Sequence, residues 1–89
     1  MSRIRLEIRI VPRPGLLDPE GKAIQSGLQS LNYTDIHEVR VGKILLIELD
    51  ADSTQDAINQ ATSMCQRLLA NPVTEDFLIK LHEDSENSE

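Results

Sequence analysis

The sequence predicts an α+β domain of the ferredoxin-like, split βαβ type: strand, helix, strand, strand, helix, strand, with both helices on one face of a four-stranded antiparallel sheet. Three observations predict this class. Residues 3–11 and 74–82 alternate apolar and polar side chains, as strands with one buried face do. Residues 35–50 hold two more such runs on either side of Gly42 and Lys43. Two stretches of helical periodicity, after Asp18 and after Ser53, separate these strands.

The first strand has the clearest alternation, and prolines end it at residues 12 and 14. Its apolar face would consist of Ile4, Leu6, Ile8 and Ile10, and its other face of Arg3, Arg5, Glu7 and Arg9.

The first helix is predicted to begin where Asp18 precedes Pro19, because Asp caps a helix N-terminus and proline fits the first helical position. It should continue to about Asn32, which tolerates the positive φ of a C-cap. Its apolar side chains form one stripe that we expect to be buried: Ile24, Leu28 and Leu31. Two glycines, Gly21 and Gly27, suggest close approach of another backbone.

The centre of the chain is read as a β-hairpin. Gly42 and Lys43 fit a two-residue type II′ turn, in which the first residue needs a positive φ. The second strand of this hairpin is apolar on both faces, with Leu45, Ile47 and Leu49 on one and Ile44 and Leu46 on the other. Such a strand is expected to be covered on both sides.

The second helix should begin at Ser53, with Asp56 completing a near capping box, and should end at Asn71 and Pro72. The side chains that recur at helical spacing, and that we expect in the core, are Ala57, Ala61, Met64, Cys65 and Leu68. Cys65 is interpreted as a small buried hydrophobe. In the last strand Phe77, Ile79 and Leu81 share one face, and Leu78 lies on the other.

Ile44, Leu46 and Leu78 would then share the outer face of the sheet with the arginines of the first strand. Three large aliphatic side chains on one face predict a subunit interface. The alternative is that they are scattered surface residues that need no partner.

Length, charge and composition exclude several classes of function. The 89 residues predict one domain over 1–82 and a disordered acidic tail over 83–89. A net charge of −6 argues against binding nucleic acid or an anionic membrane. No apolar run approaches membrane-spanning length, and the N-terminus lacks the apolar core of a signal peptide, so a cytoplasmic location is expected.

No catalytic, cofactor-binding or metal-binding residues are predicted. Cys65, His37 and His82 do not repeat at the spacing of metal ligands or of a Cys–His pair, and there is no phosphate-binding glycine loop. Arg13 could bind an anion as an arginine does in acylphosphatases, but prolines flank it and the glycine-rich context of that family is missing.

Three motifs, in order along the chain, resemble the PurS family, the small subunits of phosphoribosylformylglycinamidine synthase. Residues 14–23 read PGLLDPEGKA, residues 39–43 read VRVGK, and residues 64–73 read MCQRLLANPV. One departure is Asn32 before Tyr33, where the family usually has glycine. The motif residues that we expect to serve structure or subunit contact are Arg40, Gly42, Lys43, Asn71 and Pro72. For Gly42, Asn71 and Pro72 the alternative is a purely structural role, in which Gly42 only makes the turn and Asn71 and Pro72 only end the helix.

This resemblance implies an adaptor without chemistry of its own. In the PurS family the PurL subunit activates formylglycinamide ribonucleotide with ATP and Mg, and the PurQ subunit releases ammonia from glutamine. A PurS homodimer joins these two subunits. The alternative oligomeric state of the PurS subunit is a dimer of dimers. The enzyme as a whole would be a C–N ligase of purine biosynthesis. The main rival is a free-standing, ACT-like regulatory domain that binds a small molecule. An RNA-binding module is disfavoured, since the sheet lacks aromatic side chains for stacking.

Overall fold

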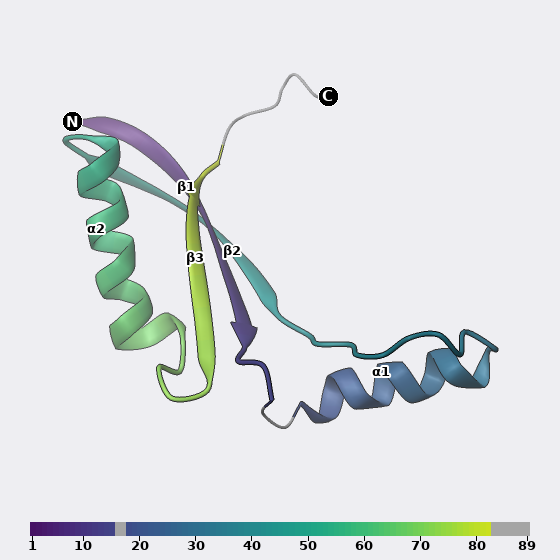
Figure 1. The fold of residues 1–89 in the computed structure, drawn as a ribbon. Helices are drawn as coiled ribbons and strands as arrows, with labels where there is room; N and C mark the ends of the chain where they lie inside the picture. The colour runs from purple at the N-terminus through teal and green to yellow at the C-terminus, as the bar shows by residue number, and fades with distance from the viewer. Residues whose placement is uncertain (16–17, 83–89) are drawn as a thin grey trace, which may run out of the picture.

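The structure, a computed structural model, describes residues 1–15 and 18–82. In this described part, three strands form an antiparallel sheet in the order β2-β1-β3 (Figure 1). They are β1 (Ser2–Pro12), β2 (Lys43–Ala51) and β3 (Glu75–Leu81). The helices are α1 (Pro19–Ser30) and α2 (Thr54–Met64), the latter continued by a π-helical turn, η1 (Cys65–Leu69). None of the described helices has the length and apolarity needed to cross a membrane.

The central strand β1 supplies the core, as its alternation predicted. Leu6, Ile8 and Ile10 are fully buried, and Ile4 nearly so. The register places Ile8 opposite Leu45 of β2 and Ile79 of β3. The helix α2 packs over this side of the sheet, with Ala57 and Ala61 buried against it. Small side chains on α2 let the helix approach the strands closely.

The capping residues predicted for both helices are confirmed. The Asp18 carboxylate accepts a hydrogen bond from the Gly21 amide at 3.1 Å, and the Ser53 hydroxyl accepts one from the Asp56 amide at 3.0 Å. Asn32 has a φ of 77°, the left-handed conformation expected after the end of α1. Local side chains therefore determine where both helices begin and where α1 ends.

The end of the second helix differs from the prediction. The Ala70 amide donates to the Cys65 carbonyl at 3.0 Å, which is the i→i+5 bond of a π turn. Cys65 remains buried, as predicted, but Leu68 is 82 % exposed. The wider π turn moves Leu68 off the buried stripe and brings Leu69 and Ala70 toward the core instead. The expectation that Leu68 is a core residue was therefore wrong.

The sheet has three strands in the described residues rather than four, because residues 35–41 form no strand. This segment runs back beside α1, as Figure 1 shows. Gln25 of α1 donates to the Ile36 carbonyl at 3.2 Å, and the Val41 amide donates to Asp18 at 2.9 Å. Since Asp18 takes the Val41 amide, that amide is not available to a β-ladder.

The predicted type II′ turn at Gly42 was wrong as well. Among the described residues only Gly15 and Asn32 have φ in the left-handed region. Gly42 is required for a different reason: a Cβ there would lie 2.5 Å from the Ile10 carbonyl oxygen of β1. Its missing side chain lets the chain enter β2 directly beside β1.

The helix α1 does not cover the sheet, contrary to the prediction of two helices on one face. Together with residues 31–42 it forms a projection from the end of the sheet, here called the arm (Figure 1). Within α1, all of which the structure describes, Gly21 alone is buried. The stripe expected in the core stays accessible, with Ile24 42 % and Leu31 67 % exposed. No part of residues 1–15 and 18–82 buries these two side chains.

Candidate functional site

The outer face of the sheet carries the predicted apolar group. Register pairs Arg9 with Ile44 on one side and with Leu78 on the other, and pairs Glu7 with Leu46. These aliphatic side chains are exposed by 59 % (Ile44), 63 % (Leu46) and 57 % (Leu78). The structure thus brings together the three residues that sequence periodicity placed on this face. We call Ile44, Leu46 and Leu78 the outer patch.

Ion pairs lie along the same face. Arg3 pairs with Asp50 at 3.4 Å and Arg5 with Glu48 at 3.2 Å, in each case across β1 and β2. Arg9 lies 2.6 Å from Glu7, and this hydrogen bond lowers the pKa of the Glu7 carboxyl from its ordinary value. Exposed pairs of this kind contribute little to stability. They neutralise the arginines around the outer patch, so the face is not a basic surface.

The base of the arm is a second cluster of motif residues. The Asp18 carboxylate accepts from two amides, those of Gly21 and Val41, and these hydrogen bonds, that of Val41 first, hold the pKa of Asp18 below its ordinary value. The Arg40 guanidinium donates to the Pro12 carbonyl at 2.6 Å and pairs with Glu38 at 3.8 Å. Arg40 therefore has a structural role between the arm and the end of β1.

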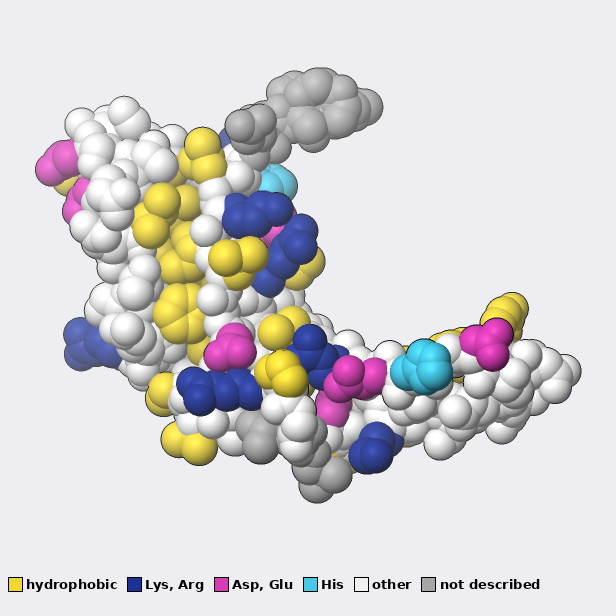
Figure 2. All heavy atoms as spheres, viewed as in Figure 1, with side chains coloured by type: hydrophobic (Ala, Val, Ile, Leu, Met, Phe, Trp, Pro, Cys, Tyr) yellow, Lys and Arg dark blue, Asp and Glu magenta, His cyan; other side chains and the backbone are white. Residues whose placement is uncertain are grey.

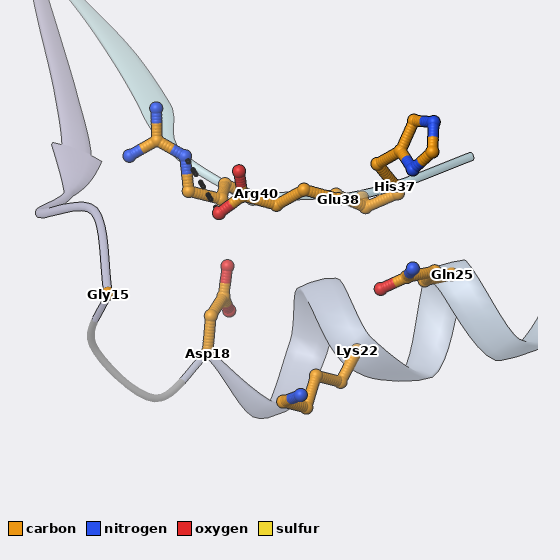
Figure 3. A pocket seen from close by; sticks show the side chains of 8 residues that line it. Gly15, Asp18, Lys22, Gln25, His37, Glu38 and Arg40 are labelled. Carbon is orange, nitrogen blue, oxygen red and sulfur yellow. Dashed lines mark ion pairs between the residues drawn. The ribbon is translucent and has the colours of Figure 1, made fainter.

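A hollow of about 610 Å³ opens between α1 and the returning segment. It is lined by Gly15, Asp18, Lys22, Gln25, His37, Glu38, Val39 and Arg40. Figure 3 shows that the charged side chains do not converge in it: Lys22 and His37 point away from one another, and Asp18 points at the backbone opposite. Its charges are mixed, and its one inward carboxylate is occupied by backbone amides. The hollow does not resemble a small-molecule site.

Asn71 and Pro72 lie in the loop after η1, where their hydrogen bonds hold the loop. The Asn71 side-chain oxygen accepts from the Val73 amide at 3.0 Å, and the Asn71 backbone amide donates to the Glu75 carboxylate at 2.7 Å. The Pro72 carbonyl accepts from the Arg13 guanidinium at 2.6 Å, and Arg13 also pairs with Asp76 at 3.2 Å. These residues stabilise the loop between η1 and β3. Arg13 is thus engaged within the chain, which removes the reason to consider it an anion-binding residue.

The remaining candidate residues, a cysteine, two histidines and a lysine, lie apart from one another. Cys65, the first residue of η1, is buried in the core, where desolvation raises the pKa of its thiol. His37 lines the arm hollow, whereas His82 follows β3 and lies 3.9 Å from Glu7. Within residues 1–15 and 18–82, no His, Cys, Asp and Glu side chains form a group that could hold a metal ion. Lys43 begins β2 and its side chain is exposed.

Sequence reasoning recognised Asp18 only as a helix cap and missed its bond to Val41. No local signal could have shown this bond, because the two residues are 23 positions apart. The close approach suggested by glycine is confirmed at Gly21, where a Cβ would collide with the Val39 carbonyl. At Gly27 nothing lies within 4 Å of a Cβ, so that part of the suggestion was wrong.

Comparison with known proteins identifies the family. The family described as PurS, phosphoribosylformylglycinamidine (FGAM) synthase, matches residues 5–83. The PurS subunit from Synechocystis sp. is 42 % identical over 74 residues, which cover 83 % of this chain and 74 % of the relative. Methanocaldococcus jannaschii PurS superposes with a TM-score of 0.77 at 30 % identity, covering 92 % of this chain and 98 % of that one. A chain of PurLQS from Thermotoga maritima gives 0.83 at 26 % identity, covering 92 % and 100 %. This chain therefore belongs to the PurS family of FGAM synthase subunits.

Proposed function

We propose that this chain is the non-catalytic adaptor of an FGAM synthase complex in purine biosynthesis, joining a PurL synthetase to a PurQ glutaminase. The observation that carries the proposal is its similarity, over the full length of the matched chain, to a chain of the T. maritima PurLQS structure. In such a complex, ammonia released from glutamine by PurQ would aminate formylglycinamide ribonucleotide on PurL with consumption of ATP and Mg. This chain would hold the other two subunits together and bind neither nucleotide nor metal.

We also propose that the adaptor is a homodimer, which could pair into a dimer of dimers. Its arm leaves Ile24 and Leu31 of the apolar stripe exposed and Leu28 partly buried, while the core-side residues of the outer strands are also only partly buried. Figure 2 shows hydrophobic side chains gathered along the sheet beside α2. If α1 of a second copy lay there, each sheet would carry two helices on one face. That is the ferredoxin-like layering which the sequence predicted within one chain.

The outer patch is then available for a further contact. Ile44, Leu46 and Leu78 lie on the face opposite α2, and their exposure supports an interface with another subunit or with a second dimer. Lys43 lies opposite Ile10 in the register, at the start of β2 and on the α2 side of the sheet, so its exposed charge supports a contact on that side rather than at the outer patch. Arg40 and Gly42 would serve the base of the arm, and Asn71 and Pro72 the loop before β3, since their contacts lie within the chain at those places.

The decisive experiment measures formylglycinamidine ribonucleotide formed by PurL and PurQ partners with and without this chain. With glutamine as nitrogen donor, product formation should depend on the chain. With ammonium salts, PurL alone should react equally well in its absence, because the adaptor serves only the transfer from PurQ. Equal glutamine-dependent rates with and without the chain would contradict the adaptor role and would favour the regulatory-domain alternative, to be examined by ligand titration.

A further inference from the structure

The arm is attached to the sheet by a few polar contacts rather than by a packed core. All of α1 is described, and its one buried residue is Gly21; α2, by contrast, buries Ala57 and Ala61 against the strands. Apolar packing resists bending over a broad area, whereas a projection held at its base depends on the individual bonds there. The contacts at the base of the arm should therefore decide the direction in which α1 points.

Asp18 makes two of these contacts with its two carboxylate oxygens. Oδ1 accepts from the Gly21 amide at 3.1 Å, inside the first turn of α1. Oδ2 accepts from the Val41 amide at 2.9 Å, two residues before β2 begins. Helix capping requires only one side-chain oxygen. The second oxygen joins the start of α1 to the segment that enters the sheet.

We propose that Asp18 is a positioning residue that sets the direction of the arm relative to the sheet. The backbone around it is closely fitted. Gly21 admits the Val39 carbonyl beside the same carboxylate, and Gly42 admits the Ile10 carbonyl of β1 at 2.5 Å from where a Cβ would lie. Arg40 adds a bond from the returning segment to Pro12 at the end of β1. Asp18 connects the helix to this group through its bond to the Val41 amide. Figure 3 shows its side chain pointing from the start of α1 toward the returning segment.

The consequence for assembly rests on the adaptor and homodimer proposed above. A stripe on α1 can reach a second copy in a defined geometry only if the arm points in a defined direction. Fixing that direction before association reduces the conformational entropy lost on binding. Loss of the Asp18–Val41 bond should weaken assembly even when α1 itself remains helical.

The substitution Asp18→Asn separates the two functions of this side chain. Asn caps helices about as well as Asp, but it replaces one of the two carboxylate oxygens with an NH2 donor. Because Gly21 and Val41 bond to different oxygens of Asp18, one of the two amides then loses its acceptor. The matched control is Ser53→Ala, which removes the N-cap of α2 and leaves the arm base intact. Both substitutions are introduced into a chain that carries Gly27→Ala. Alanine at this position stabilises the helix α1 and meets no atom within 4 Å. Unfolding of α1 is then not mistaken for a change in arm direction.

Arm direction is measured as the distance between spin labels at positions 29 and 80, on α1 and β3, in a Cys65→Ala chain diluted with unlabelled protein. The parent and the Ser53→Ala variant should give one narrow distance distribution, whereas Asp18→Asn should broaden or shift it. Circular dichroism confirms that α1 is retained. An unchanged distribution in Asp18→Asn would refute the positioning role.

The same variants are then tested for glutamine-dependent product formation with PurL and PurQ. Asp18→Asn should reduce stimulation several-fold at limiting adaptor concentration, and Ser53→Ala should not. If the parent chain gives no stimulation, the adaptor function fails while the distance measurement still decides the role of Asp18. If Asp18→Asn moves the arm but stimulates as well as the parent, the link from arm direction to assembly is refuted.

Discussion

Two glycines that look alike in the sequence have different surroundings in the structure. Gly27 and Gly42 are both glycines next to apolar residues, yet the space around them differs. A Cβ at Gly42 would meet a backbone oxygen and the Val11 side chain, whereas a Cβ at Gly27 would meet nothing within 4 Å. The sequence marked both as unusual, but only the packed backbone shows which of them is required.

These two glycines make a matched pair of predictions. Gly42→Ala should lower the free energy of unfolding by about 1–3 kcal/mol, because β1 must shift to admit the methyl group. Gly27→Ala should raise it by about 0.5–1 kcal/mol, since alanine favours the helix. Urea denaturation followed by circular dichroism measures both. Equal effects of the two changes would show that close approach at Gly42 is not limiting.

Asp18 predicts a dependence of stability on pH. Its pKa is lower in the folded chain than in the unfolded chain, so the unfolded chain binds more protons between the two values. The stabilisation is fully present above the pKa of the unfolded chain and disappears as pH falls through that of the folded chain. The difference in unfolding free energy between the parent and Asp18→Asn should therefore shrink in acid. A difference that stays constant from neutral pH to pH about 3 would contradict this linkage.

Among the elements, the end of the second helix was the hardest to anticipate. Its apolar spacing is that of an α-helix through Leu68, but the i→i+5 bond from Ala70 to Cys65 widens the last turn. Periodicity assumes a constant number of residues per turn, so one π turn changes which side chains are buried. The core then receives Leu69 and Ala70, and Leu68 projects outward.

This geometry predicts unequal costs for truncating two leucines. Leu68→Ala should change the free energy of unfolding by no more than about 0.5 kcal/mol, as is usual at an exposed position. Leu6→Ala, at a fully buried position in β1, should cost about 2–5 kcal/mol. Both are measured by urea denaturation of the purified chain. A large loss at Leu68 would mean that this side chain is buried in solution.

At the scale of the whole molecule, the chain is more extended than a compact domain of the same length. Its radius of gyration is 16.6 Å, whereas about 12 Å is typical for a compact domain of this length. The arm contributes to this extension, since it projects away from the sheet (Figure 2). An extended chain with an uncovered apolar stripe gains stability when another copy covers that stripe.

Two substitutions separate the proposed contact surfaces. Ile24→Asp in the arm stripe should dissociate the homodimer, because an unpaired carboxylate would be buried in the interface. Ile44→Asp in the outer patch should weaken self-association of dimers, or binding of a partner subunit, while the helices remain formed. Sedimentation velocity measures self-association and circular dichroism measures helix content. Gln29→Asp, an exposed change on α1 outside the arm stripe and the outer patch, is the control and should leave sedimentation unchanged. Unaltered sedimentation in Ile24→Asp would contradict the homodimer arranged through the arm.

The sequence by itself determined the central strand, both helix N-termini and the burial of Cys65, because alternation, capping and composition are local properties. It also placed Ile44, Leu46 and Leu78 on one face, since strand periodicity is strict. Only the tertiary structure decided that residues 35–41 run beside α1, that Gly42 serves close approach and that α1 leaves the sheet. Each of these depends on contacts between segments distant in sequence, above all the Asp18–Val41 bond across 23 residues. A competing backbone partner of this kind overrides a local strand preference, and no pattern within one segment can reveal it.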